Sequence, residues 1–150
     1  MRGFIVYDTR HGNTEQIAHA IAEGFAGVGE VVLRKAADAR PEEIQSAELL
    51  LAGCPVHGWN ISKPMKAFLD SLGARRFEGM PAAAFDTKFK SLLAGGAAKK
   101  IAARLEKLGF SLIADPQSFF VAGMQGPLRE GELDRARAFG AGLAERLSSS

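Results

Sequence analysis

Short apolar runs alternate with amphipathic helical patterns along the whole chain, and this alternation limits the possible folds more than any other feature. Residues 49–51 (Leu-Leu-Leu) belong to a continuous apolar run, which is typical of a strand covered on both faces. Such an order predicts parallel strands joined by right-handed crossover helices, that is, a doubly wound α/β sheet between two helical layers. The expected strands cover residues 3–8, 30–35, 47–54, 81–87 and, interrupted near Pro116, 110–114 with 118–121.

The expected helices have recognisable start and stop signals. Ser62 is a good N-cap, with Pro64 in the first turn that follows. Pro41 opens a short helix with two acids in its first turn, and Gly109 ends the helix that follows Gly96. The expected helices cover residues 14–28, 41–44, 62–72, 97–108 and about 130–147.

The bulk composition is that of one ordinary globular domain covering residues 1–150. Hydrophobic residues make up 47% and charged residues 24%, so we expect a packed core without extensive disorder. No basic-then-apolar leader opens the chain, and no apolar run is long enough to span a membrane. The lone Cys54 fits a reducing compartment. We therefore expect a cytoplasmic protein, either a monomer or a weak homodimer.

The net charge is +2, but the charge is unevenly distributed. Between residues 85 and 107 there are six bases and two acids. One interpretation is an ordinary solvated helix face. Another is a docking patch for an acidic redox partner or an anionic substrate. Nucleic acid is not expected as a partner, because the patch lacks interleaved aromatic residues.

A short polar loop follows the first expected strand and leads at once into a helix. This order directs free backbone amides and the positive end of a helix at one point, which favours an anion. The loop is not a dinucleotide fingerprint, because it lacks the Gly-x-Gly-x-x-Gly spacing. It is not a Walker loop either, because no Lys-Ser or Lys-Thr pair follows Gly12. Its hydroxyl and amide side chains suit a phosphate held mainly by neutral donors. The loop residues are Thr9, Arg10, His11, Gly12, Asn13 and Thr14.

Residues 5–21 resemble the opening of flavodoxins. Two aliphatic residues and an aromatic residue are followed by the pattern Thr9, Gly12, Thr14, Ala18 and Ile21. The resemblance implies a flavodoxin-like three-layer α/β/α fold, with a five-stranded parallel sheet in the order 2-1-3-4-5. It also implies that the loop holds the phosphate of a noncovalent flavin mononucleotide (FMN), and that the protein transfers electrons between redox partner proteins.

The resemblance assigns two further loops to the flavin. The loop after the third strand would contact the isoalloxazine ring, with Trp59 able to stack on it and Gly58 beside flavin N5. Residues of this loop are Pro55, Val56, His57, Gly58, Trp59 and Asn60. The loop after the fourth strand begins at Asp86 and Thr87, which could bond the ring edge. The alternative, purely structural interpretations are that Trp59 is a packing residue and that Gly58 only shapes a turn. His11 and His57 would then face solvent.

Several other functions remain possible on this fold. A phosphatase with Cys54 as nucleophile would need an arginine six positions later, where Asn60 stands, so Cys54 is best interpreted as a small buried residue. No metal-ligand spacing appears. Within redox chemistry, the rival is an FMN-dependent oxidoreductase acting on a quinone or another planar electron acceptor, of the quinone reductase or menaquinone-dependent protoporphyrinogen oxidase type. A second rival is a cofactor-free signalling or interaction module.

Familiar flavodoxins are strongly acidic around the flavin, and this chain departs from that pattern. Near the expected site the bases are Arg10, Lys63, Lys66, Lys88 and Lys90, against the acids Asp8, Glu15, Asp70 and Asp86. We therefore expect the reduced, anionic flavin to be less disfavoured here than in an acidic flavodoxin.

Overall fold

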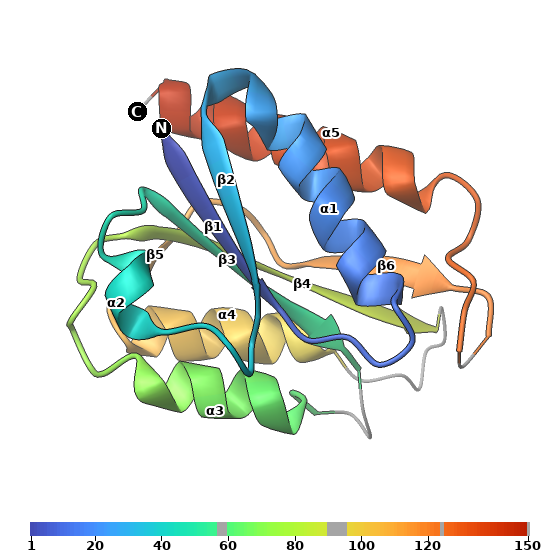
Figure 1. The fold of residues 1–150 in the computed structure, drawn as a ribbon, viewed down its shortest axis with the longest axis horizontal. Helices are drawn as coiled ribbons and strands as arrows, with labels where there is room; N and C mark the ends of the chain where they lie inside the picture. The colour runs from blue at the N-terminus through green and yellow to red at the C-terminus, as the bar shows by residue number, and fades with distance from the viewer. Residues whose placement is uncertain (57–59, 90–95, 124, 150) are drawn as a thin grey trace.

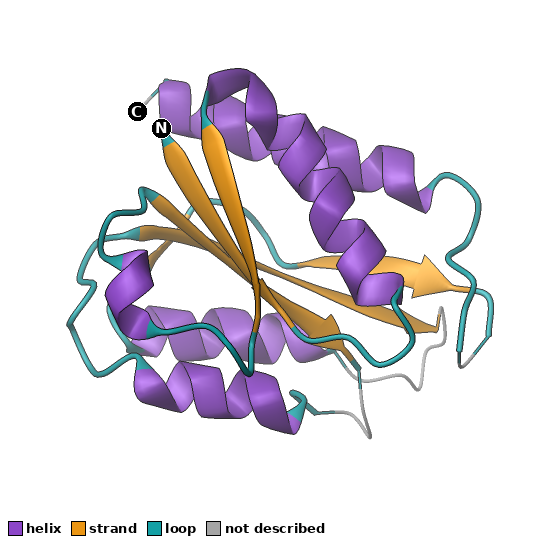
Figure 2. Ribbon diagram, viewed as in Figure 1, coloured by secondary structure: helices purple, strands orange, loops and turns teal. Residues whose placement is uncertain are grey.

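The computed structural model describes residues 1–56, 60–89, 96–123 and 125–149, and these form a parallel sheet between two layers of helices (Figures 1 and 2). The sheet order is β2-β1-β3-β4-β5, and β6 also pairs with β4. The order predicted from the resemblance to flavodoxins is therefore confirmed, with the interrupted fifth strand appearing as β5 and β6. The strands are β1 (Arg2–Tyr7), β2 (Glu30–Lys35), β3 (Leu49–Pro55), β4 (Pro81–Phe89), β5 (Ser111–Leu112) and β6 (Gln117–Val121).

The helices divide between the two faces of the sheet. In Figure 1, α1 and α5 lie together on one face, and α3 and α4 lie on the other. No helix in the described ranges is both long enough and apolar enough to cross a membrane. The helices are α1 (Asn13–Phe25), α2 (Pro41–Ile44), α3 (Lys63–Ser71), α4 (Ala97–Lys107) and α5 (Glu132–Ser148), and a single 3₁₀ turn (Ala26–Val28) follows α1.

Alternate residues of β3 supply the two apolar layers of the core. Leu50, Ala52 and Cys54 pack beneath α3 and α4, whereas Leu49 and Leu51 pack beneath α1 and α5. All five side chains are at most 3% exposed. This confirms the prediction of a central strand covered on both faces. The carboxyl end of β3 therefore lies between the carboxyl ends of β1 and β4.

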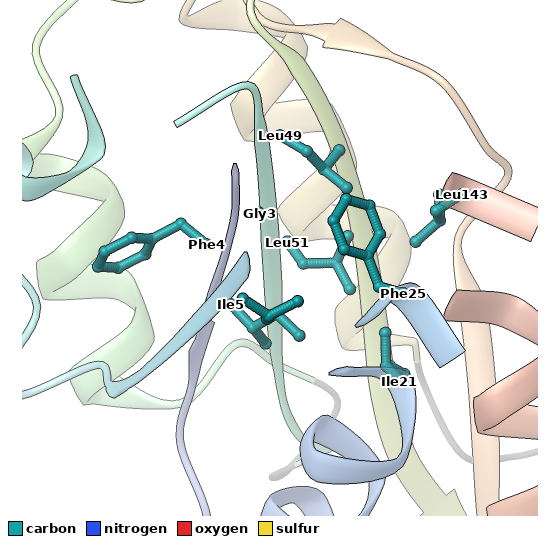
Figure 3. A pocket seen from close by; sticks show the side chains of 9 residues that line it. Gly3, Phe4, Ile5, Ile21, Phe25, Leu49, Leu51 and Leu143 are labelled. Carbon is teal, nitrogen blue, oxygen red and sulfur yellow. The ribbon is translucent and has the colours of Figure 1, made fainter. Parts of the chain in front are cut away.

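The helices α1 and α5 approach each other so closely that glycine is required on both. A Cβ on Gly24 would clash with the carbonyl oxygen of Arg137, and a Cβ on Gly140 would clash with that of Ile21. Beneath this contact lies a small apolar cavity of about 10 Å³, with Phe25 and Leu143 among its walls (Figure 3). Its lining offers no polar partner for water, so we regard it as a packing defect.

The fourth strand is longer than predicted. The sequence suggested a strand ending at Thr87 and a loop starting at Asp86, but β4 continues to Phe89. The reason is a partner distant in sequence: β6 pairs residue by residue with β4 from Phe85↔Gln117 to Phe89↔Val121. Asp86 and Thr87 therefore lie within the sheet, in agreement with the expected strand 81–87, and only their assignment to the loop that follows it is wrong.

Side chains from α5 cover the free edge of β6. The carboxylate of Glu132 accepts a hydrogen bond from the Phe120 amide at 2.7 Å, and Arg135 donates to the Ser118 carbonyl at 2.6 Å. These two groups make the contacts that a neighbouring strand would make, and so they protect an edge that could otherwise pair with another chain.

Candidate functional site

The loop between β1 and α1 is held by hydrogen bonds and leaves the start of α1 without a side-chain cap. The Asp8 amide donates to the Gly53 carbonyl, and the Gly12 amide donates to the Thr9 hydroxyl, both at 3.0 Å. Gly12 is the N-cap of α1, with φ 87°, and it provides no side-chain cap. A Cβ placed on Gly12 would meet no described atom within 4 Å. The N-cap therefore offers no side-chain acceptor to the first amides of this thirteen-residue helix, an arrangement that suits a bound anion.

Two polar side chains of this loop point inward and tie it to other segments. Thr14 is 1% exposed, and its hydroxyl lies 2.8 Å from that of Thr87 on β4. The Asn13 amide group donates to the Gln125 carbonyl at 3.2 Å. The loop after β1 is thus joined to the carboxyl-terminal part of β4 and to the segment after β6, at the end of the sheet where doubly wound folds bind their ligands. Gln125 was missed from the sequence, because its backbone carbonyl takes part and no residue type marks it.

The exposed part of the loop consists of Arg10 and His11. Both side chains are exposed, whereas Thr9 is half-buried beside them. The interpretation of His11 as a solvent-facing residue agrees with this position. A cationic Arg10 at the rim adds positive charge to the open end of α1.

The loop after β3 is only partly described. Pro55 and Val56 are half-buried, and the Val56 amide donates to the Thr87 carbonyl at 3.0 Å. His57, Gly58 and Trp59 lie outside the described residues, so their predicted roles stay predictions. Asn60 is exposed, and its side-chain oxygen accepts a hydrogen bond from Lys100 on α4 at 3.3 Å.

The carboxyl group of Asp86 is buried between β4 and α4. It is 0% exposed, and its Oδ2 accepts the Ala98 amide at 2.9 Å. Its Oδ1 is buried without a hydrogen-bond partner among the described residues. Burial raises the pKa of Asp86, although the amide of Ala98, the hydroxyl of Ser118 and the charge of Lys88 act in the opposite direction. Thr87, 4% exposed, faces α1 instead. Both side chains therefore make their bonds inside the protein.

Cys54 lies next to Asp86 across the sheet and is also buried. Burial raises the pKa of its thiol to about 11, and the negative charges of Asp86 and Asp8 raise this pKa further. Hydrogen bonds with Ser62 lower it, but their effect is smaller than that of burial. A thiol in this state is protonated at neutral pH and is a poor nucleophile. The interpretation of Cys54 as a small buried residue is confirmed.

Comparisons with known proteins agree with this arrangement. The family model for flavodoxin matches residues 5–139. A flavodoxin from Clostridium saccharobutylicum is 27% identical over 158 residues, which cover 98% of each chain. A coenzyme F420H(2) oxidase from Methanocaldococcus jannaschii is 30% identical over 152 residues, covering 97% of this chain but 35% of the oxidase. The solved structure of a flavodoxin from the domain Archaea matches with a TM-score of 0.86 at 25% identity, over 99% of both chains.

The matched region contains the end of β1, the start of α1, the central strand and the first part of α5, so it includes the loop segments that form the candidate site. The resemblance seen in residues 5–21 is therefore confirmed over nearly the whole chain. The chain belongs to the flavodoxin family, whose members bind FMN noncovalently and transfer electrons.

Proposed function

We propose that this protein is an FMN-dependent electron carrier in which residues 9–14 hold the phosphate of the cofactor. The observation that carries the proposal is the uncapped start of α1, which opens beside the point where strand order reverses between β1 and β3. Ligands of doubly wound sheets bind at such a point. The side chains available here, a threonine hydroxyl, an amide and an arginine, suit a phosphate ester.

The remaining residues would position the cofactor. Residues 55–60 would contact the ring, with Trp59 stacked on it. Thr87 would position the phosphate loop through its hydrogen bond to Thr14. Asp86 would position the start of α4 through its hydrogen bond with the Ala98 amide. Phe89, at the end of β4, is 37% exposed and provides a second aromatic surface near this edge. Bound FMN supplies the one- and two-electron chemistry, while the protein controls its potential and its access to partners.

The phosphate assignment is tested by placing a charge on Gly12. Asp and Asn both tolerate the left-handed backbone at this position, and both have open space there. The two side chains have the same shape, so Gly12→Asn is the matched control for Gly12→Asp. We expect Gly12→Asp to bind FMN roughly tenfold or more weakly than Gly12→Asn, because only the carboxylate repels the phosphate.

Riboflavin, which lacks the phosphate, provides the internal comparison. Both variants are expected to bind riboflavin equally, as measured by quenching of flavin fluorescence. Equal FMN affinities for the two variants, with both folded, would show that the phosphate does not lie at Gly12.

The carrier and the small-substrate enzyme differ in what reduces them. A carrier is reduced by a partner reductase and shows no significant turnover of NADPH with a quinone. Sustained NADPH–quinone turnover by the purified protein would instead identify a quinone reductase. We expect the first result.

The partner and the cellular setting follow from charge and cysteine content. The bases of the segment 85–107 support a redox partner with an acidic surface. The single buried Cys54 supports residence in a reducing compartment such as the cytoplasm. We also propose a monomer or weak homodimer, which size-exclusion chromatography with light scattering would test.

A further inference from the structure

A groove runs between α3 and α4, the two helices that lie side by side on one face of the sheet (Figure 1). Its volume is about 580 Å³. Ile61 and Ala103 supply apolar surface, and we call it the α3–α4 groove. None of the described residues that line it has a carboxylate. Its cations are Lys66, Lys100, Arg104 and Lys107.

The four cations differ in their partners within the protein. Arg104 pairs with Asp70 at 2.5 Å, and Lys100 donates a hydrogen bond to Asn60 at 3.3 Å. In the described part of the chain, no ion pair joins Lys66 or Lys107 to an acid. The groove therefore carries a net positive charge, and it attracts acidic groups from solution.

The cations form a row along the groove. Lys100, Arg104 and Lys107 are spaced four and three residues apart, so they share one face of α4 and extend over about 10 Å. Lys66 adds a further positive charge from α3. Such a row fits carboxylates distributed along a segment of another protein, whereas a single phosphate would contact only part of it.

The position of the groove connects it to electron transfer. Asn60 borders the groove and directly follows residues 57–59, which belong to the loop assigned to the flavin ring. We propose that the α3–α4 groove is the docking site for an electron-transfer protein that presents an acidic segment, an inference that rests on the proposed function as an FMN carrier. A partner bound there contacts Asn60, the last residue of the loop assigned to the flavin ring.

The test measures electron transfer from a reduced acidic iron–sulfur ferredoxin to the FMN-loaded protein. One electron leaves the ferredoxin cluster and enters the bound flavin, and the second-order rate constant is followed at several salt concentrations. The groove variant is Lys66→Gln with Lys107→Gln. The matched control is Lys35→Gln with Arg75→Gln, which removes two charges from exposed positions outside the groove.

We expect the groove variant to react roughly tenfold more slowly than the control at low ionic strength, and to lose much of the salt dependence. Equal rates in the two variants would overturn the docking site. So would a slowing of the wild-type reaction by millimolar inorganic phosphate beyond that caused by potassium chloride at equal ionic strength, since the groove would then be a small-anion site.

FMN affinity and photochemical reduction are measured for each variant, and both are expected to match the wild-type values. These two readouts depend on the cofactor site and not on docking. Failure of the wild-type protein to bind FMN would contradict the proposed function itself. Normal FMN binding with equal ferredoxin rates would contradict only the docking site.

Discussion

Asp86 is a carboxylic acid placed in an apolar layer with incomplete hydrogen bonding. One of its oxygens accepts the Ala98 amide at the start of α4, and the other is buried without a partner in the described part of the chain. Because burial raises the pKa of Asp86, the folded protein keeps the carboxyl proton to a higher pH than the unfolded chain does. Its ionisation therefore opposes folding.

Replacing the Asp86 carboxyl group with an amide removes the unfavourable effect of its ionisation on folding. Above the ordinary carboxyl pKa of 3.8, the folded state binds more protons than the unfolded state, so wild-type stability falls as pH rises toward the folded pKa. Asp86→Asn keeps an acceptor for the Ala98 amide but does not ionise. We expect the variant to become progressively more stable than wild type as the pH rises from the ordinary carboxyl pKa of 3.8 toward the raised pKa of the folded protein, as measured by urea unfolding. The exposed Asp38→Asn is the control, and parallel curves for Asp86→Asn and wild type would contradict the prediction.

At the same scale, the sequence indicates which residues share the loop better than it indicates the hydrogen bonds that they make. Thr9, Gly12 and Thr14 could be recognised because adjacent residues form one loop. The hydroxyl of Thr14, however, bonds to Thr87, and Asn13 bonds to the Gln125 carbonyl. These partners lie on other segments, so no local pattern predicts them.

The contact between α1 and α5 depends on two glycines that face the opposite helix. A Cβ on Gly140 would clash with the Ile21 carbonyl, which belongs to a rigid helix backbone. We expect Gly140→Ala to destabilise the protein by roughly 1–3 kcal/mol, because the helices must move apart. Thermal or urea unfolding measures this change.

Gly142 is the matched control, two residues further along the same helix. A Cβ there would meet no described atom within 4 Å. Gly142→Ala is therefore expected to stabilise the protein by about 0.5–1 kcal/mol through helix propensity alone. The same sign of change in both variants would show that the helix contact is not as close as the structure describes.

The helices and strands could be predicted where their sequence signals are local. The end of a strand could not be predicted where it depends on a partner that is distant in the sequence. The buried faces of α1, α3, α4 and α5 follow from their periodicity, and Ser62 caps α3 as expected. The extension of β4 to Phe89 depends on pairing with β6. The protection of β6 by Glu132 and Arg135 depends in turn on where α5 starts, which no pattern within β6 indicates.

For the molecule as a whole, alternation of strands and helices predicted the layers, while the order of strands came from the resemblance to flavodoxins. The charge around the site then becomes interpretable. Glu15 accepts a hydrogen bond from Tyr7 at 2.8 Å, and Asp70 pairs with Arg104. Asp86 is buried with a raised pKa. Asp8 and Glu15 remain as acids without an ion pair among the described residues, against the cations Arg10, Lys63, Lys66 and Lys88, so positive charge dominates near the site.

A positive environment stabilises the anionic, fully reduced flavin. We therefore expect the lower of the two flavin potentials to be less negative than that of an acidic flavodoxin titrated in the same buffer. Lys63 begins α3, directly after the ring-contacting loop. Lys63→Glu should make that potential more negative by roughly 20–40 mV, as expected for reversing one charge about 10 Å away in water.

Arg75→Glu supplies the control for this measurement, because Arg75 precedes β4 and lies at the opposite end of the strands from the site. We expect its potential to match wild type at moderate ionic strength, since the separation exceeds the screening length. Equal shifts in both variants would trace the potential to net charge rather than to charges near the flavin. A wild-type potential as low as that of an acidic flavodoxin would contradict the charge argument, because the local excess of cations would then have no effect on the reduced cofactor.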